Sequence, residues 1–86
     1  MELILFSSSF CEPCAQTRAV LAEVERMVPQ ATVVEFDVAR DSGEAEAHGI
    51  RATPTVLVRT ADGTEVFRGV GAPTLDQVLV AAAKAL

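Results

Sequence analysis

Two cysteines, in the sequence Cys11-Glu12-Pro13-Cys14, lie between a short apolar segment at residues 3–6 and a stretch with helical periodicity. They are the only cysteines among the 86 residues. Residues i and i+3 in the first turn of a helix lie about 5–6 Å apart, which suits a disulfide. A bridge over so few residues stabilises a fold only slightly. The pattern therefore favours a thiol pair that cycles between dithiol and disulfide.

The hydrophobic pattern of the remaining chain predicts four strands. Residues 2–6 are almost continuously apolar, as in a strand that is covered on both faces of a sheet. Residues 32–38 alternate between apolar and polar positions. The β-rich segments 55–59 and 65–68 flank Asp62-Gly63, which is a hairpin turn signal.

Helix signals separate these strands. Ser-x-x-Glu at residues 9–12 and Thr-x-x-Gln at residues 74–77 match the capping box. Asp41 is the expected N-cap of a short middle helix, and Pro29 is expected to end the first helix near Val28. The expected apolar stripes are Val20, Leu21, Val24, Met27 and Val28 in the first helix, and Leu75, Leu79, Ala82 and Leu86 in the last.

The resulting order is βαβαββα, in one domain that spans residues 1–86. A helix joins the first two strands, so we expect them to be parallel with a right-handed crossover. The last two strands form an antiparallel hairpin. The sequence therefore predicts an α/β fold with a four-stranded mixed sheet and helices on both faces.

Charge and hydropathy narrow the classes of function. Twelve acidic and seven basic residues give a net charge of −5, which argues against nonspecific nucleic-acid binding. No apolar run approaches the length of a membrane span, and the N-terminus lacks the features of a signal peptide. We therefore expect a cytoplasmic protein, in which a C-x-x-C beside a βαβ pattern is typical of redox activity.

Cys11 is the expected attacking thiol. A helix N-terminus stabilises a thiolate through its unpaired N–H groups and its dipole, and the thiolate is the form that attacks disulfides. Cys14 lies one turn inside the helix, so we expect it to be less exposed and to have a higher pKa. Cys11 would form a mixed disulfide with a partner, and Cys14 would then release the reduced partner by attacking Cys11.

Two other interpretations of the cysteine pair stay open. The cysteines can be ordinary buried residues, or they can bind a zinc ion or an iron–sulfur cluster. Zinc normally takes four ligands, and the chain offers two cysteines, His48 and carboxylates. A cluster shared between two subunits would need only two cysteines from each. We expect no bound metal, and we expect His48 to end the second helix rather than to act in catalysis.

Three segments in order resemble the thioredoxin superfamily, over nearly the whole chain. They are Phe10-Cys11-Glu12-Pro13-Cys14, Gly49-Ile50-Arg51-Ala52-Thr53-Pro54-Thr55 and Val70-Gly71-Ala72. The small, glutaredoxin-sized thioredoxins of archaeal type are the most similar, because they also lack the first strand and helix of full-length thioredoxins. The resemblance implies a protein disulfide reductase without a bound cofactor, and we expect a monomer. Its partners would be disulfide-containing proteins and a thioredoxin-reductase-like donor that takes electrons from NADPH.

The resemblance also implies a partner-binding surface around the cysteines. Pro54 would follow a cis peptide bond and lie against the cysteine pair, so that Thr53 presents free backbone groups to a partner. Gly71 would let the backbone of the partner approach closely. Phe10, at a position where many thioredoxins have tryptophan, would supply apolar surface. A strand-opening proline, a loop glycine and an ordinary packed phenylalanine are the alternatives.

The two positions between the cysteines are Glu12 and Pro13, and we expect both to contact the partner. Glycine is commoner in the family at the position of Glu12. Its charge opposes a thiolate on Cys11 but suits the start of a helix. These effects partly cancel, so we expect a pKa of Cys11 closer to that of thioredoxins than to that of strong oxidants.

Two further positions depart from full-length thioredoxins. Leu5 replaces a buried aspartate that helps to move protons for the second cysteine, and Glu35 stands where those proteins have a lysine. The hypothesis is that a half-buried Glu35 with a raised pKa accepts the proton of Cys14. A solvated glutamate on a strand face is the alternative.

Other functions compete with protein disulfide reduction. A glutathione-dependent glutaredoxin is the closest, but residues 69–72 depart from the Gly-Gly and acidic pair with which glutaredoxins hold glutathione. No lysine or arginine lies just before Cys11 either. A metal or cluster carrier and a redox-silent adaptor are the remaining classes.

Overall fold

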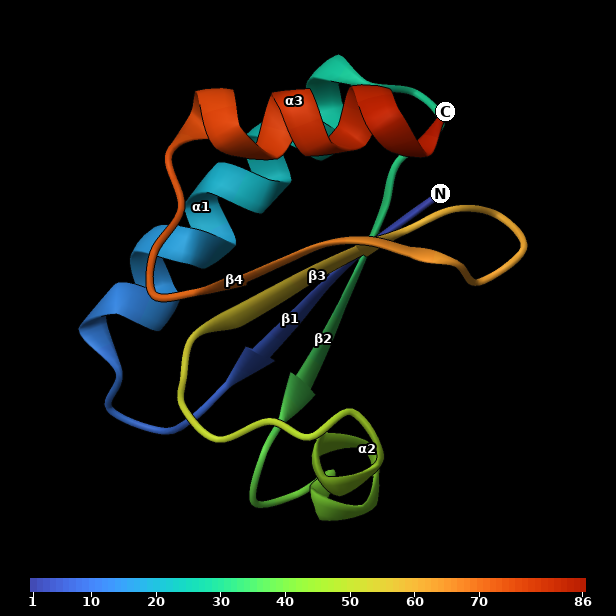
Figure 1. Cartoon of the computed structure of the whole chain (residues 1–86). Coiled ribbons are helices and arrows are strands. Elements are labelled where there is room, and N and C mark those ends of the chain that lie inside the picture. Colours follow the sequence, from blue (N-terminus) through green and yellow to red (C-terminus); the bar gives the residue numbers. More distant parts are fainter.

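The computed structural model describes residues 1–86 and contains four strands and three helices in the predicted order (Figure 1). The elements are β1 (Glu2–Ser7), α1 (Glu12–Met27), β2 (Thr32–Asp37), α2 (Ser42–Ala47), β3 (Thr55–Arg59), β4 (Glu65–Val70) and α3 (Leu75–Ala85). None of the helices is long and apolar enough to cross a bilayer.

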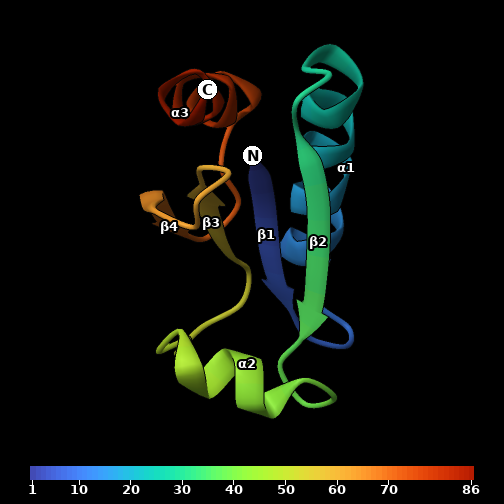
Figure 2. The same cartoon turned by 90° about the vertical axis from the view of Figure 1, so that its right-hand side faces the viewer.

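The strands form one sheet in the order β2-β1-β3-β4. β1 runs parallel to β2, as expected for strands joined by a helix, and antiparallel to β3. β3 and β4 form the predicted antiparallel hairpin. The four-stranded mixed sheet is therefore confirmed. Figure 2 shows that β1 and β2 end at the same edge of the sheet, where the loop from β1 to α1 begins.

Two apolar cores lie on opposite faces of the sheet. α1 and α3 cover one face and α2 lies on the other (Figure 1). Leu3 and Leu5 of β1 belong to the core under α1 and α3, whereas Ile4 and Phe6 pack with Ala45 of α2. Burial on both faces explains why the sequence of β1 is almost continuously apolar.

The start of α1 differs from the sequence-based expectation. A capping box at residues 9–12 would make Phe10 the first helical residue, but Phe10 has a left-handed backbone with φ of 56°. The helix begins at Glu12 instead, and its N-cap is Cys11. The predicted box between Ser9 and Glu12 is therefore wrong, and a cysteine sulfur takes the place of the serine hydroxyl.

The other helix ends follow the predictions more closely. α3 begins with the predicted capping box between Thr74 and Gln77. Asp41 is the N-cap of α2, although its carboxylate accepts a hydrogen bond from the N–H of Asp37 instead of capping the helix. His48 is the C-cap of α2, as predicted.

Most of the predicted stripes of the two long helices are confirmed, because Leu21, Val24 and Ala82 are buried and Val20, Val28, Leu75 and Leu79 pack against the same core. The buried residues also include Cys14 and Thr17 in α1 and Val78, Ala81 and Ala85 in α3. Met27 and Leu86, which the sequence placed in these stripes, are exposed. Hydropathy favours large side chains, whereas close packing of α3 on α1 and the sheet selects small ones.

Candidate active site

Cys11 and Cys14 form a disulfide at the N-terminus of α1, with their Cα atoms 5.1 Å apart. The loop after β1 carries Cys11, and the first turn of α1 carries Cys14. Cys11 is partly exposed, whereas Cys14 is only 1 % exposed. A partner can therefore approach the sulfur of Cys11 but not that of Cys14, which is the difference in access that the sequence predicted.

The first turn of α1 is arranged to stabilise negative charge on Cys11. The backbone N–H of Cys14 donates a hydrogen bond to Sγ of Cys11 over 3.1 Å. Pro13 has no N–H and occupies a first-turn position, where a helix does not need one. The same N–H and the dipole of this 16-residue helix lower the free energy of a thiolate at Cys11 once the disulfide is reduced.

Three loops meet at the end of the sheet from which the cysteine loop starts. The hydroxyls of Ser8 and Thr53 lie 2.7 Å apart, within hydrogen-bond distance, which joins the loop after β1 to the segment before β3. The N–H of Gly71, after β4, donates to the carbonyl of Pro54 over 2.9 Å. The Thr53-Pro54 peptide bond is cis, as the resemblance implied, and Pro54 is buried. These contacts bring Thr53, Pro54 and Gly71 to the end of the sheet from which the cysteine loop starts.

Gly71 has a φ of 93°, in the region that favours glycine. A Cβ atom built at Gly71 would meet no atom within 4 Å. The need for glycine therefore comes from the backbone conformation, and the space above it is open to a partner.

The rim of the site is apolar and exposed. The ring of Phe10, next to Cys11, is fully exposed, and Val70 is 70 % exposed. A left-handed φ at a residue other than glycine costs about 1–2 kcal/mol. Phe10 thus shows its ring to solvent from an unfavourable backbone conformation, which is an arrangement often found at functional sites.

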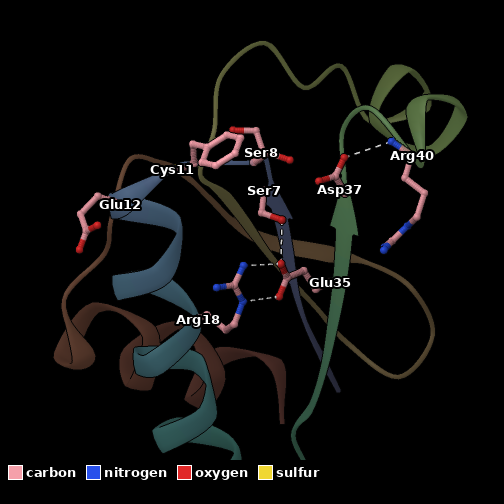
Figure 3. A pocket seen from close by; sticks show the side chains of 10 residues that line it. Ser7, Ser8, Cys11, Glu12, Arg18, Glu35, Asp37 and Arg40 are labelled. Carbon is pink, nitrogen blue, oxygen red and sulfur yellow. Dashed lines mark hydrogen bonds and ion pairs between the residues drawn. The ribbon is translucent and has the colours of Figure 1, made fainter.

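The structure contradicts the expected raised pKa of Glu35. The guanidinium of Arg18, in α1, donates two hydrogen bonds to the Glu35 carboxylate, over 2.8 and 2.7 Å, and Ser7 donates a third over 2.7 Å (Figure 3). The hydrogen bond from Arg18 is the largest of the effects that lower the pKa of Glu35 below its ordinary value of 4.5. A carboxyl group held ionised in this way is a poor acceptor for a thiol proton near neutral pH.

The role of Arg18 was not predicted from the sequence, because Glu35 was considered only as a position on a strand and not together with the helix that packs over that strand. Arg18 lies one helical turn beyond Cys14, and α1 packs over the sheet next to β2. The available signal was that Arg18 follows Cys14 by four residues, which places both on the same side of α1. The Arg18–Glu35 pair ties α1 to β2, and the bond from Ser7 adds the end of β1.

The variant Glu35→Gln tests this ion pair. Because Arg18 is 52 % and Glu35 31 % exposed, solvent screens the pair, and we expect the substitution to lower the free energy of unfolding at pH 7 by only about 0.5–1 kcal/mol. The lowered pKa means that this stabilisation is complete above the ordinary glutamate pKa and is lost as the pH falls through the lower pKa of the folded state. Urea unfolding at pH 7 and at about pH 3 measures the difference.

Wild type and Glu35→Gln should therefore converge in stability as the pH falls. Glu46→Gln, in an exposed position of α2 without an ion pair, is the matched control and should change little at either pH. A stability difference for Glu35→Gln that stays constant down to pH 3 would show that the charge of Glu35 does not contribute.

The structure offers no group of three or more histidine, cysteine, aspartate or glutamate side chains placed to hold a metal ion. Leu5, which replaces the aspartate of full-length thioredoxins, is completely buried in the core under α1 and α3. The redox-active group that the site contains is the Cys11–Cys14 disulfide.

Comparisons with known proteins agree with the site. A family model described as "Thioredoxin" matches residues 1–84. A thioredoxin of Methanocaldococcus jannaschii is 32 % identical over 87 residues, and the match covers 100 % of this chain and 96 % of that protein. An H-type thioredoxin of Oryza sativa subsp. indica is 36 % identical over 70 residues, covering 81 % of this chain and 57 % of that protein.

Solved structures of thioredoxins are also similar to this chain. The reduced thioredoxin pre-protein of Schistosoma mansoni has a TM-score of 0.85 at 25 % identity, covering 99 % of this chain and 78 % of that one. Mitochondrial thioredoxin 3 of Saccharomyces cerevisiae, in its oxidised form, has a TM-score of 0.80 at 25 % identity, covering 99 % and 77 %.

The fold and the bonded cysteine pair define a dithiol–disulfide oxidoreductase. The chain belongs to the thioredoxin family. Its almost complete mutual coverage with the archaeal protein confirms the predicted similarity to small thioredoxins of archaeal type.

Proposed function

We propose that this protein reduces disulfides in other proteins, with Cys11 as the attacking and Cys14 as the resolving residue. The thiolate of Cys11 attacks one sulfur of the target disulfide, and the other target sulfur leaves as a thiolate. The thiolate of Cys14 then attacks Sγ of Cys11, and the second target sulfur leaves. The Cys11–Cys14 disulfide has formed, and two electrons have passed to the target.

The difference between the two sulfurs carries this assignment. Cys11 is partly exposed and accepts the hydrogen bond from the helix N-terminus, whereas Cys14 is buried. Only an exposed thiolate can reach a disulfide on another protein, and only a neighbouring buried thiol can resolve the product without being captured itself.

The partner is proposed to contact six residues around Cys11: Phe10, Glu12, Pro13, Thr53, Pro54 and Gly71. The exposure of Phe10, Glu12 and Pro13 and the open space above Gly71 support this surface. The bonds that join the loops of Ser8, Thr53 and Gly71 hold the surface in one arrangement. An extended partner segment can lie across it.

We further propose that the protein works as a single-domain monomer in the cytoplasm.

A thioredoxin-reductase-like protein is proposed to return the electrons from NADPH. The measurement is the rate of NADPH oxidation with insulin as target, with either a thioredoxin reductase or glutathione plus glutathione reductase as donor. Faster turnover with thioredoxin reductase supports the proposal. Turnover with glutathione alone would make the protein a glutaredoxin.

A further inference from the structure

An open cleft of about 730 Å³ lies beside Cys11. Figure 3 shows its walls: the loop after β1 with Ser8 and Cys11 on one side, and the end of β2 with Asp37 on the other. The parallel pairing of β1 and β2 produces this arrangement, because both strands deliver their last residues to the same edge of the sheet. Only two of the ten lining residues are hydrophobic, so the cleft suits a polar group of a target.

Most charges in and around the cleft already neutralise each other. Arg18 is paired with Glu35, and Arg40 donates two hydrogen bonds to Asp41. The cations that line the cleft are therefore occupied by carboxylates of this chain. An anionic group of a target would find no free cationic partner there.

Asp37 forms no salt bridge, although the guanidinium of Arg40, which is hydrogen-bonded to Asp41, is near enough to interact with it electrostatically. The Oδ1 atom of Asp37 accepts the N–H groups of Ala39 and Arg40 over 2.9 and 3.1 Å, which fix the orientation of the side chain. Its Oδ2 atom accepts no hydrogen bond in this chain. Glu12, on the Cys11 side of the cleft, is exposed and also lacks a salt bridge. The carboxylates without a salt bridge on the two sides of the cleft therefore both present negative charge to a ligand.

We propose that this cleft holds a lysine or arginine side chain of the target protein, and that Asp37 makes disulfides with a nearby basic residue the preferred substrates. This inference depends on the proposed reduction of protein disulfides. In an extended target segment, a residue two positions from the attacked cysteine lies about 6–7 Å from it. A lysine or arginine side chain at that position can enter the cleft, because Cys11 itself lines it.

The exposed ring of Phe10 fits the same occupant. Phe10 lies at the rim of the cleft, beside Cys11. The aliphatic part of a lysine, or the flat guanidinium of an arginine, can pack against a phenylalanine ring while its charge reaches the carboxylate. Asp37 thus favours a positively charged side chain of the target, and Phe10 contacts the aliphatic part of that side chain.

The net charge of −5 will attract any basic peptide, so the test must separate a local contact from general attraction. Three peptides, each closed by one disulfide, differ only at the residue two positions from one cysteine, which is Lys, Gln or Glu. The measurement is kcat/KM for each peptide at low ionic strength, with the same reductase as donor. Wild type is compared with Asp37→Asn and Glu25→Gln.

Asp37→Asn removes the charge but keeps an oxygen for the N–H groups of Ala39 and Arg40. Glu25→Gln makes the same change in net charge and keeps the oxygen that accepts the N–H of Val33. Glu25 lies about 20 Å from the start of α1, at 1.5 Å per residue. Glu25→Gln therefore controls for attraction by the whole molecule.

Wild type is expected to reduce the Lys peptide about threefold faster than the Gln peptide, with the Glu peptide slowest. Asp37→Asn should bring the ratio of Lys to Gln close to one, and Glu25→Gln should preserve it. Equal rates for the three peptides with wild type, or a ratio that survives in Asp37→Asn, would overturn the inference. If Asp37→Asn does not fold, Asp37→Ser makes the same change in charge and keeps a hydroxyl oxygen for the N–H groups of Ala39 and Arg40. Failure to reduce any peptide would contradict the proposed function instead.

Discussion

Cys11→Ser is expected to reduce the rate of disulfide reduction by at least about 10³-fold, because loss of a nucleophile removes the only group that starts the reaction. A serine hydroxyl has no accessible anion at neutral pH and cannot form a disulfide. The measurement is the reduction of insulin disulfides with dithiothreitol as donor. The free dithiothreitol reaction sets the background.

The fold should survive this substitution, because the Cys11–Cys14 bridge closes a loop between residues only three apart in sequence. Circular dichroism and thermal unfolding of the variant serve as the control. Cys11→Ser with wild-type activity and an intact fold would assign the attack to another residue.

Cys14→Ser is expected to stop turnover at the mixed disulfide. Cys11 keeps its helix N-terminus and can still attack, but no second thiol lies next to it to displace the target. The covalent complex of the variant with a target should accumulate and remain until external thiol is added. Mass spectrometry of the unreduced sample measures its amount.

The double variant Cys11→Ser/Cys14→Ser provides the background for this capture experiment and should give no adduct. The assignment of roles is wrong if adducts form with Cys11→Ser and are absent with Cys14→Ser, because Cys14 would then be the residue that attacks. The captured proteins would also identify the physiological targets.

The sequence predicted the fold well because its strongest signals are local. The continuous apolar run of β1, the alternation of β2 and the Asp62-Gly63 turn each depend on neighbours in the chain. Positions within the helices were harder to predict. Met27 and Leu86 look like core residues by hydropathy but are exposed, whereas the packing of α3 buries the small residues Ala81 and Ala85, which the pattern did not select.

The cysteine pair of the candidate site could be predicted from the sequence, but its surroundings could not. The neighbouring positions and different exposure of Cys11 and Cys14 follow from the helix spacing. The state of Glu35 depends on Arg18, which is 17 residues away in sequence and reaches it only through the packing of α1 on the sheet. The cleft beside Asp37 likewise requires the parallel register of β1 and β2.

Cys11 and Cys14 are expected to exchange two electrons as a pair. A redox titration, followed by trapping of free thiols and mass spectrometry, measures this directly. We expect one reversible transition in which both thiols appear together, with a slope of about 30 mV for each tenfold change in the ratio of the dithiol to the disulfide form. Thiols that appear independently, or a disulfide that cannot be re-formed, would contradict it.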